Sequence, residues 1–270
     1  MIKPYYKTDL GVLYHGDCLE IMPLLEPVDL VLTDPPYGKT DANWDKSIPL
    51  ELIWLALEKL RNMNTPVLLF GDEPFSSFIR MSNIKEFKYD WIWIKNRPTG
   101  ALSKDIMPLA CIENISVFYS KPPTYNPQMK KRTEKELKRL AKNSTCNRNI
   151  KSTIGFATSN IQKRDNMQYK YPRRDIYIDT VLNRSIEKVK HPNQKPVALF
   201  EYLIKTYTHD SDTVLDFTMG SGTTAIACER LNRRWIGIEI EEKYCEIAAK
   251  RIEKERSQLK LFTSDVYVTD

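Results

Sequence analysis

The sequence predicts an α/β fold in which helices cover both faces of a doubly wound, mostly parallel sheet, with a basic region inserted in the middle. Short runs of β-branched and aromatic residues alternate with segments of helical apolar spacing in the first 120 and the last 80 of the 270 residues. Residues 121–190 lack this regularity and carry an excess of positive charge. A chain of this length buries a large core without disulfides or metal.

The first part of the chain, residues 1–120, is expected to form the first half of this sheet. Short apolar runs of the kind that is buried on both faces of a parallel sheet predict strands at residues 11–15, 28–33, 66–70, 89–94 and 115–119. Apolar residues at helical spacing predict helices at residues 50–60 and 75–81. Strand and helix therefore alternate as they do in α/β proteins.

The last part, residues 191–258, repeats this alternation. A helix is expected from Pro196, whose fixed φ suits the first helical position. The following elements are a strand at 213–217, a helix at 223–231, a strand at 234–240 and a helix at 244–255. Residues 259–270 carry no assignment and are treated as a tail.

Residues 121–190 contain 18 Lys and Arg against 6 Asp and Glu, a net charge of +12 within a chain whose total is +6. Aromatic residues are interleaved with these charges, at Tyr125, Phe156, Tyr169, Tyr171 and Tyr177. One interpretation is a solvated linker, because runs of charge are often just that. We favour a segment that contacts nucleic acid, because basic and aromatic side chains together suit phosphates and bases.

The remaining composition narrows the class of protein. The five cysteines are odd in number and scattered, which is typical of reduced thiols inside a cell, and they lie at Cys18, Cys111, Cys146, Cys228 and Cys245. With only three histidines, no cluster has the ligand spacing of a metal site, so no metal is expected. The chain begins without a signal-peptide core and has no apolar run of about 18 residues, so a cytoplasmic protein without membrane contact is expected.

A rigid turn directly follows the expected strand at 28–33, with the sequence Asp34-Pro35-Pro36-Tyr37. Two consecutive prolines cannot continue a strand ladder, and they fix the backbone at its carboxyl end. Open α/β sheets bind their ligands at that end. The turn therefore holds a carboxylate, a backbone carbonyl and an aromatic ring where a substrate is expected.

These groups suit the chemistry of an exocyclic amino group on a nucleobase. Its lone pair is delocalised into the ring, and two acceptors aimed at its N–H bonds help to localise that pair. The carboxylate of Asp34 and the carbonyl of Pro35 are such acceptors. A base that leaves the duplex can stack on Tyr37, a contact worth about 1–3 kcal/mol. Taken by itself, the tetrapeptide fits an ordinary strand-ending turn better than a catalytic site.

A second motif lies between the expected strand at 213–217 and the helix at 223–231. It is a glycine turn of the kind that binds cofactors, and its candidate binding residues are Asp216, Phe217, Thr218, Gly220, Ser221, Gly222, Thr223 and Thr224. Glu239 ends the next strand, where a carboxylate can accept hydrogen bonds from ribose hydroxyls. The same spacing fits a nicotinamide dinucleotide site. The turn at Asp34 and the basic insert have no use in hydride transfer, however, and favour a methyl donor.

With these motifs in this order, the chain resembles the amino-directed DNA methyltransferases of the β motif order, in their adenine-specific branch, over nearly its whole length. The segment from His191 to Pro196, which contains Lys195, resembles the family's segment that lines the methionine end of the cofactor. Asp17 resembles the acidic residue that binds the cofactor's adenine. The pair Trp44-Asp45 resembles a flexible segment beside the target base. The chain departs from the family at Phe217-Thr218, where Pro-Phe is more common.

The resemblance implies a Rossmann-like methyltransferase fold, S-adenosyl-L-methionine as cofactor and N6 of adenine in DNA as target, in a restriction-modification, phage or orphan context. It also implies that the strand ending at Asp216 lies beside the strand ending at Asp34, and that catalysis needs no general base of high pKa. A homodimer and a cognate restriction endonuclease are partners that it allows.

Several alternatives stay open at this point. The same fold can act on N4 of cytosine, although such family members usually carry Ser where Asp34 stands. Relatives with a Pro-Pro-Tyr turn methylate RNA or protein amides, but the late glycine turn and the basic insert argue against these targets. A DNA-binding protein with an inactive site, and a nicotinamide oxidoreductase, are less favoured. Asp17 is also compatible with a helix cap, and Lys195 with a solvated helix start.

Overall fold

The computed structural model describes residues 2–38, 47–101, 104–143, 168–182, 185, 187–191 and 193–264. It divides the chain into two compact units. The first comprises Met1–Asn126 and Arg174–Asp270, and the second comprises Pro127–Arg173.

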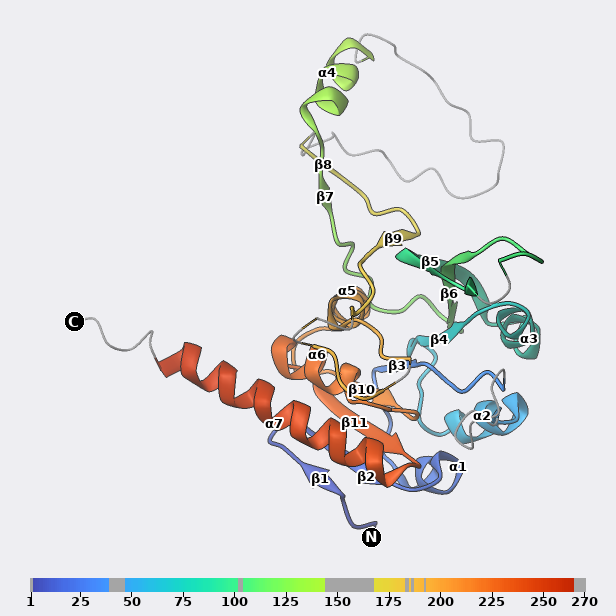
Figure 1. Ribbon diagram of the computed structural model, residues 1–270, viewed down its shortest axis with the longest axis vertical. Coiled ribbons are helices and arrows are strands. Elements are labelled where there is room, and N and C mark those ends of the chain that lie inside the picture. The colour runs from blue at the N-terminus through green and yellow to red at the C-terminus, as the bar shows by residue number, and fades with distance from the viewer. Residues whose placement is uncertain are drawn as a thin grey trace. The chain divides into compact units, whose positions relative to one another are not determined.

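The first unit is built on a sheet that contains nine strands within the described residues (Figure 1). In spatial order they are β1 (Tyr6–Lys7), β2 (Gly11–His15), β11 (Arg234–Glu239), β10 (Thr213–Asp216), β3 (Leu30–Thr33), β4 (Val67–Gly71), β6 (Ala110–Phe118), β5 (Phe87–Thr99) and β9 (Asp175–Tyr177). The five strands from β2 to β4 in this order run parallel, while β1 and β6 run antiparallel to their neighbours. The expected doubly wound, mostly parallel sheet is confirmed.

The strand order places the two sequence motifs side by side. β10 pairs with β3 in parallel, with Val214 opposite Leu30 and Leu215 opposite Val31, so the expected adjacency is confirmed. The carboxyl ends of all five parallel strands therefore lie along one edge of the sheet. Because β6 is antiparallel to β4, its beginning lies at this same edge, where Asn114 is opposite Gly71.

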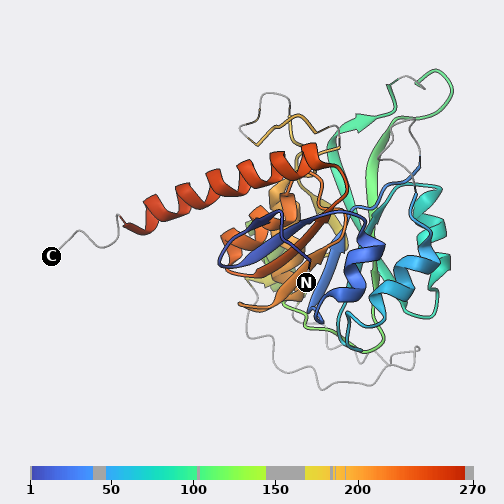
Figure 2. The same cartoon turned by 90° about the horizontal axis from the view of Figure 1, so that it is seen from below.

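Helices cover both faces of the sheet (Figure 2). One face carries α1 (Cys18–Ile21), the 3-10 helix η1 (Met22–Leu24), α2 (Leu50–Leu57) and α3 (Phe75–Ser82), and the other carries α5 (Val197–Tyr207), α6 (Thr223–Leu231) and α7 (Glu242–Ser264). Among the described residues, no helix is long and apolar enough to cross a membrane.

Successive side chains of the central strands point to opposite faces of the sheet, and both faces are covered by helices, which explains why these strands are continuous apolar runs. In β3, Leu30 and Leu32 pack in the same cluster as Phe200 of α5, whereas Val31 packs in the opposite cluster with Ile53 of α2. All three β3 side chains are completely buried. Each face of the strand must therefore be apolar, as expected for a parallel sheet between two helical layers.

Most expected elements are present, with shifted ends. β2 and α6 have the expected bounds, whereas β5 and β6 are longer than expected and pair with each other. The helix expected at 244–255 continues to Ser264, into the segment that the sequence left as a tail from 259. No Gly or Pro interrupts residues 256–264, so nothing local ends the helix there.

The second unit contains a two-stranded antiparallel pair, β7 (Lys130–Lys131) and β8 (Tyr169–Lys170), and helix α4 (Glu134–Asn143). Thr133 and Glu136 form a capping box at the start of α4: the Thr133 N–H donates to the Glu136 carboxylate at 2.9 Å and the Glu136 N–H to Thr133 Oγ1 at 3.3 Å. This arrangement satisfies two backbone donors at the helix start.

The second unit is shorter than the basic insert expected at 121–190, because both ends of that stretch are tied to the first unit. The backbone N–H of Asn126 donates to the carbonyl of Thr206 in α5 at 2.7 Å. At the other end, the carbonyl of Arg174 accepts from Ile92 N–H at 2.8 Å, and the residues that follow pair with β5 as strand β9. Residues 121–126 and 174–190 therefore belong to the first unit.

Candidate active site

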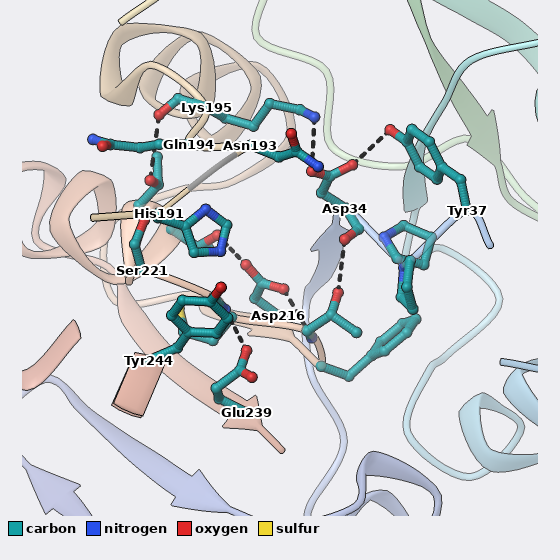
Figure 3. Close-up of a pocket in the computed structure, with 18 of the residues that line it drawn as sticks. Asp34, Tyr37, His191, Asn193, Gln194, Lys195, Asp216, Ser221, Glu239 and Tyr244 are labelled. Carbon is teal, nitrogen blue, oxygen red and sulfur yellow. Dashed lines mark hydrogen bonds and ion pairs between the residues drawn. The ribbon is translucent and has the colours of Figure 1, made fainter. Parts of the chain in front are cut away.

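A cavity of about 730 Å³ opens at the edge where the parallel strands end (Figure 3). Its volume lies within the range of about 300–1,000 Å³ that is usual for small-molecule sites. The structure brings together the following sequence-predicted residues in its lining: Asp17, Asp34, Pro35, Pro36, Tyr37, Lys195, Asp216, Phe217, Thr218, Gly220, Ser221, Thr223, Thr224 and Glu239. Within the described ranges, no cluster of three or more His, Cys, Asp or Glu side chains is placed to hold a metal ion.

The glycine turn requires glycine at two positions. Gly220 and Gly222 have φ values of +54° and +83°, which side chains rarely adopt. A Cβ on Gly222 would lie 2.9 Å from the Cβ of Ala248 in α7, and one on Gly220 would lie 3.1 Å from Nε2 of His191. Gly222 therefore allows the turn to pack on α7, while Gly220 leaves room beside His191 in the lining.

Asp216 organises the inside of this turn. Its carboxylate accepts hydrogen bonds from Thr33 Oγ1 at 2.7 Å, from the Thr218 N–H at 3.1 Å and from Thr224 Oγ1. The side chain is buried, and this burial raises the pKa of Asp216 to about 6. Uncharged hydroxyl and N–H donors, rather than a cation, therefore hold this carboxylate.

Thr218 joins the two motifs. Its hydroxyl donates to the backbone carbonyl of Asp34 at 3.1 Å, and its Oγ1 lies 2.5 Å from Oγ1 of Thr33. Phe217 is only 1 % exposed and packs in the core with Leu215. At the position where the sequence departs from the usual Pro-Phe, the aromatic residue thus supports the sheet and the hydroxyl residue connects the turns.

On the other side of the glycine turn, Glu239 ends β11 and Asp17 follows the end of the neighbouring strand β2. The Glu239 carboxylate accepts the Gly220 N–H at 2.7 Å and the Glu241 N–H at 2.9 Å, and its burial raises its pKa. Asp17 accepts the Leu19 N–H at 2.8 Å and so caps α1 while also lining the cavity. Each carboxylate oxygen has a second lone pair, so these residues keep the capacity to accept ligand hydrogen bonds.

Asp34 sits among charged and hydroxyl partners (Figure 3). Its Oδ1 accepts the Tyr37 hydroxyl at 2.6 Å, and its Oδ2 lies 2.7 Å from the Nζ of Lys195. The ring of Tyr37 packs at 5.1 Å from that of Phe75. Burial raises the pKa of Asp34, and the Lys195 ammonium opposes this effect. The carboxylate and the ring that the sequence predicted as catalytic are thus in direct contact.

Glu113 and Lys95 complete this cluster, and sequence reasoning missed both. Glu113 lies in β6, is 4 % exposed, and pairs with Lys195 and with Lys95 of β5 at 2.7 Å each. The two cations hold the pKa of Glu113 near 2. No local pattern marks this residue, since its partner Lys195 lies far away in the sequence.

The ammonium of Lys195 therefore contacts Asp34 and Glu113. The sequence, by contrast, assigned Lys195 to cofactor binding. Its backbone carbonyl accepts the Thr223 hydroxyl at 3.3 Å, which links the segment before α5 to the glycine turn. The cofactor assignment of Lys195 stays a prediction.

His191 and Arg251 support the glycine turn. His191 packs edge-on against Tyr244 at 4.6 Å, and burial lowers its pKa to about 4. Its buried Nδ1 has no hydrogen-bond partner among the residues that the structure describes. Arg251 of α7 donates to the Ser221 carbonyl at 2.6 Å and to Ser221 Oγ at 3.0 Å. Sequence reasoning missed Arg251 because nothing in a long charged helix singles it out. The expected pair Trp44-Asp45 lies outside the described residues.

The lining fits S-adenosylmethionine. Glycine permits close approach to the turn, and a Cβ on Gly220 would narrow the space beside His191. Asp17 and Glu239 provide carboxylate acceptors of the kind that ribose hydroxyls and an adenine amino group require. The orphaned Nδ1 of His191 adds a polar atom to the same wall. A ligand with several hydrogen-bond donors is therefore well matched to these walls.

Comparison with known families agrees with this geometry. The model of a DNA methylase family of the N6/N4 methyltransferase type matches residues 28–250, which include both turns and the basic insert. The chain belongs to this DNA methylase family. It is an S-adenosylmethionine-dependent DNA methyltransferase, as the resemblance implied.

Individual relatives are similar to this chain over most of its length. The chain is 27% identical to the type II methyltransferase M2.DpnII of Streptococcus pneumoniae, with 94% of each chain covered. It is 26% identical to M.BamHI of Bacillus amyloliquefaciens, covering 96% of this chain and about three fifths, 61%, of that relative. Among solved structures, M1.HpyAVI in complex with SAM matches with a TM-score of 0.60 and 26% identity, covering 90% of this chain and 98% of that one.

Proposed function

We propose that this enzyme methylates N6 of adenine at a specific sequence in DNA. The observation that carries the proposal is the position of Asp34 beside the glycine turn, with Thr218 of that turn bonded to the Asp34 carbonyl. Strands that pair in a sheet lie about 4.8 Å apart, so a donor at one turn and an amine at the other are close neighbours. Alignment of two reactants in this way lowers the barrier.

On the donor side, S-adenosylmethionine supplies a methyl group on a positively charged sulfur. Glu239 and Asp17 would bind its nucleoside part, and Gly220 lets the ligand lie close to the backbone. Asp216 acts from inside the turn, because its carboxylate is occupied by Thr33, Thr218 and Thr224.

On the acceptor side, Asp34 accepts an N–H of the target amine and helps to localise the nitrogen lone pair. The carbonyl of Pro35 is the proposed second acceptor. Tyr37 is held by Phe75 and by its bond to Asp34, and its ring is the proposed stacking surface for the flipped base. A methylated amine that carries a surplus proton is strongly acidic, so that proton leaves to water without a base of high pKa.

The second unit is the proposed DNA-contacting region. Its exposed cations include Lys130 and Lys131 of β7 and Lys135, Lys138 and Arg139 of α4. Exposed Lys and Arg side chains bind phosphates and make binding dependent on salt. Bases are then recognised by other contacts within the same region.

The biological setting forms part of this proposal. The relatives are type II methyltransferases, which supports a restriction-modification setting with a cognate endonuclease. A homodimer is also part of the proposal, and a measurement of the protein's mass in solution tests it. The free thiols of Cys18, Cys111, Cys228 and Cys245 support action in the reducing cytoplasm.

The test is to incubate the purified protein with S-adenosylmethionine and duplex DNA and to identify the modified nucleoside by mass spectrometry. N6-methyladenine is expected, and single-molecule sequencing of DNA from a host expressing the gene would give its sequence context. N4-methylcytosine would overturn the choice of base. Absence of any methylated nucleoside, with S-adenosylmethionine bound, would overturn DNA methylation.

A further inference from the structure

We propose that Lys195 keeps Asp34 ionised and oriented for the target amine, and that Glu113 holds Lys195 in position, so that the two form a positioning pair. This inference rests on the proposed function, because it concerns the carboxylate that binds that amine. Neither residue is proposed to touch the base or to take part in bond making.

The geometry consists of a row of alternating charges, in the order Lys95, Glu113, Lys195 and Asp34. Successive carboxylate oxygens and ammonium nitrogens are each 2.7 Å apart. The side chain of Lys195 is 11% exposed and that of Glu113 is 5% exposed. Charges that are shielded from water in this way interact strongly, so each one influences the ionisation of the next.

Tyr37 connects the two carboxylates by a second path. Its hydroxyl lies 2.6 Å from Asp34 Oδ1 and 3.1 Å from Glu113 Oε1. A phenol has one proton, and the shorter distance favours Asp34 as its acceptor. Glu113 therefore faces both partners of Asp34, and a change at Glu113 reaches Asp34 through Lys195 and through Tyr37.

The pair is needed because Asp34 becomes more deeply buried when a base binds. Placing a base in the cavity removes water from Asp34, which favours the neutral acid, and a neutral acid is a weaker acceptor for the amine. The Lys195 ammonium lowers the pKa of Asp34, whereas the Glu113 charge raises it. Glu113 also holds Lys195 in place. Within the described part of the chain, the titratable side chains that line the cavity on the elements around Asp34 are Tyr37, Asp72, Lys95, Glu113, Lys195 and Asp216.

The two partners should therefore shift the pH profile in opposite directions. Because the ionised Asp34 is the active form, activity is lost as the pH falls through its pKa. Lys195→Met removes the effect that lowers this pKa, so the acid limb of kcat should move to higher pH. Glu113→Gln removes the effect that raises it, so the limb should move to lower pH. Shifts of about one unit or more are expected for charges this close.

Two further variants serve as controls. Lys195→Arg keeps the cation and should restore the wild-type limb. Lys205→Met removes an exposed lysine of α5, 3.8 Å from Glu201 and outside the cavity, and should leave the limb unchanged. If the pair had a purely structural role, Lys195→Met and Glu113→Gln would both lower kcat, but the acid limbs of their pH profiles would not move in opposite directions.

A readout without DNA separates this inference from the proposed function. The pH titration of the Asp34 carboxyl can be followed by carbon-13 NMR and assigned with Asp34→Asn, so it remains informative if the enzyme methylates no DNA. Equal or unidirectional shifts in the two variants would overturn the inference. Should Lys195→Met fail to fold, as judged by thermal melting, an unchanged titration in Glu113→Gln would overturn it. Weakened donor binding with an unchanged Asp34 titration would instead assign Lys195 to the cofactor.

Discussion

At the scale of single residues, three carboxylates at one sheet edge are held by three kinds of partner. Asp34 faces a lysine and a phenol, Asp216 is surrounded by hydroxyls and an N–H, and Glu239 accepts two backbone N–H groups. A carboxylate that is paired with neutral donors shapes the backbone around it. Asp34 is paired with the buried Lys195 ammonium, which keeps it ionised and oriented toward a substrate amine, and this difference separates its proposed role from that of Asp216.

Asp34→Asn should separate catalysis from binding. The amide keeps the size of the side chain and loses the charge that helps to localise the amine lone pair. We expect kcat to fall by roughly 10²–10³, with S-adenosylmethionine binding and thermal stability nearly unchanged. DNA affinity should stay the same or rise, because a negative charge near phosphates is removed. An Asp34→Asn enzyme that methylates DNA at the wild-type rate would contradict the proposed role.

Glu239→Gln should weaken donor binding. The amide presents an NH₂ group where two backbone N–H groups and the ligand hydroxyls need acceptors, so one donor is left unpaired. A charged hydrogen bond contributes about 1.5–3 kcal/mol, which predicts a Kd for S-adenosylmethionine raised roughly 10- to 100-fold in calorimetry. Glu242→Gln, an exposed neighbour in α7, is the matched control. Equal affinities in both variants would remove Glu239 from the donor site.

At the scale of elements, the glycine turn and the start of α4 are stabilised in different ways. The glycine turn packs on α7 through Gly222 and is bonded by Arg251, while α4 in the second unit is started by its own capping box. The first arrangement needs a helix from the chain's end, and the second needs only four consecutive residues. Helix α4 can therefore form from local interactions and present its cations wherever the second unit lies.

Removal of the α4 cations should weaken DNA binding and flatten its salt dependence. In the variant Lys135→Gln, Lys138→Gln and Arg139→Gln, the capping residues Thr133 and Glu136 are kept, so the helix start remains intact. Each lost phosphate contact should reduce the slope of log affinity against log salt by about 0.9. The control replaces three exposed lysines of the first unit, Lys59, Lys85 and Lys88. If the α4 variant keeps the wild-type slope, this helix is only solvated.

At the scale of the whole molecule, the site is assembled from both ends of the chain. Residues 34–37 near the start of the chain form the acceptor turn, whereas the donor side combines Asp17 with the glycine turn and Glu239 from the last part of the chain. The strands that carry them, β3 and β10, pair only when the first unit is folded. A ligand that bridges these parts binds the folded unit and not the unfolded chain, so binding is linked to its stability.

S-adenosylmethionine at 100 times its Kd should stabilise the first unit by about 2.7 kcal/mol and raise its Tm by several degrees. Hydrogen exchange should slow in β2, β3, β10 and β11, and remain unchanged in α4 of the second unit. Scanning calorimetry and mass-detected exchange measure these effects. Protection confined to α4, or a Tm that does not respond to the donor, would contradict a site built in the first unit.

The amino-acid sequence by itself determined the elements and turns whose causes are local. Apolar runs predicted β2 and β3, the double proline predicted the end of β3, and the glycines at 220 and 222 predicted the turn before α6. In each case the residues that decide the backbone are neighbours along the chain. The order of the motifs was enough to identify the family, and with it the adjacency of β3 and β10.

The tertiary structure alone decided which distant side chains meet. Glu113 reaches Lys195 only because β6 runs antiparallel to β4, and Arg251 reaches Ser221 only because α7 folds back along the sheet. The bounds of the second unit were likewise decided by the bonds of Asn126 and Arg174 to the first unit. These contacts join residues far apart in the chain, and their energies arise only once the sheet has closed the distance between them.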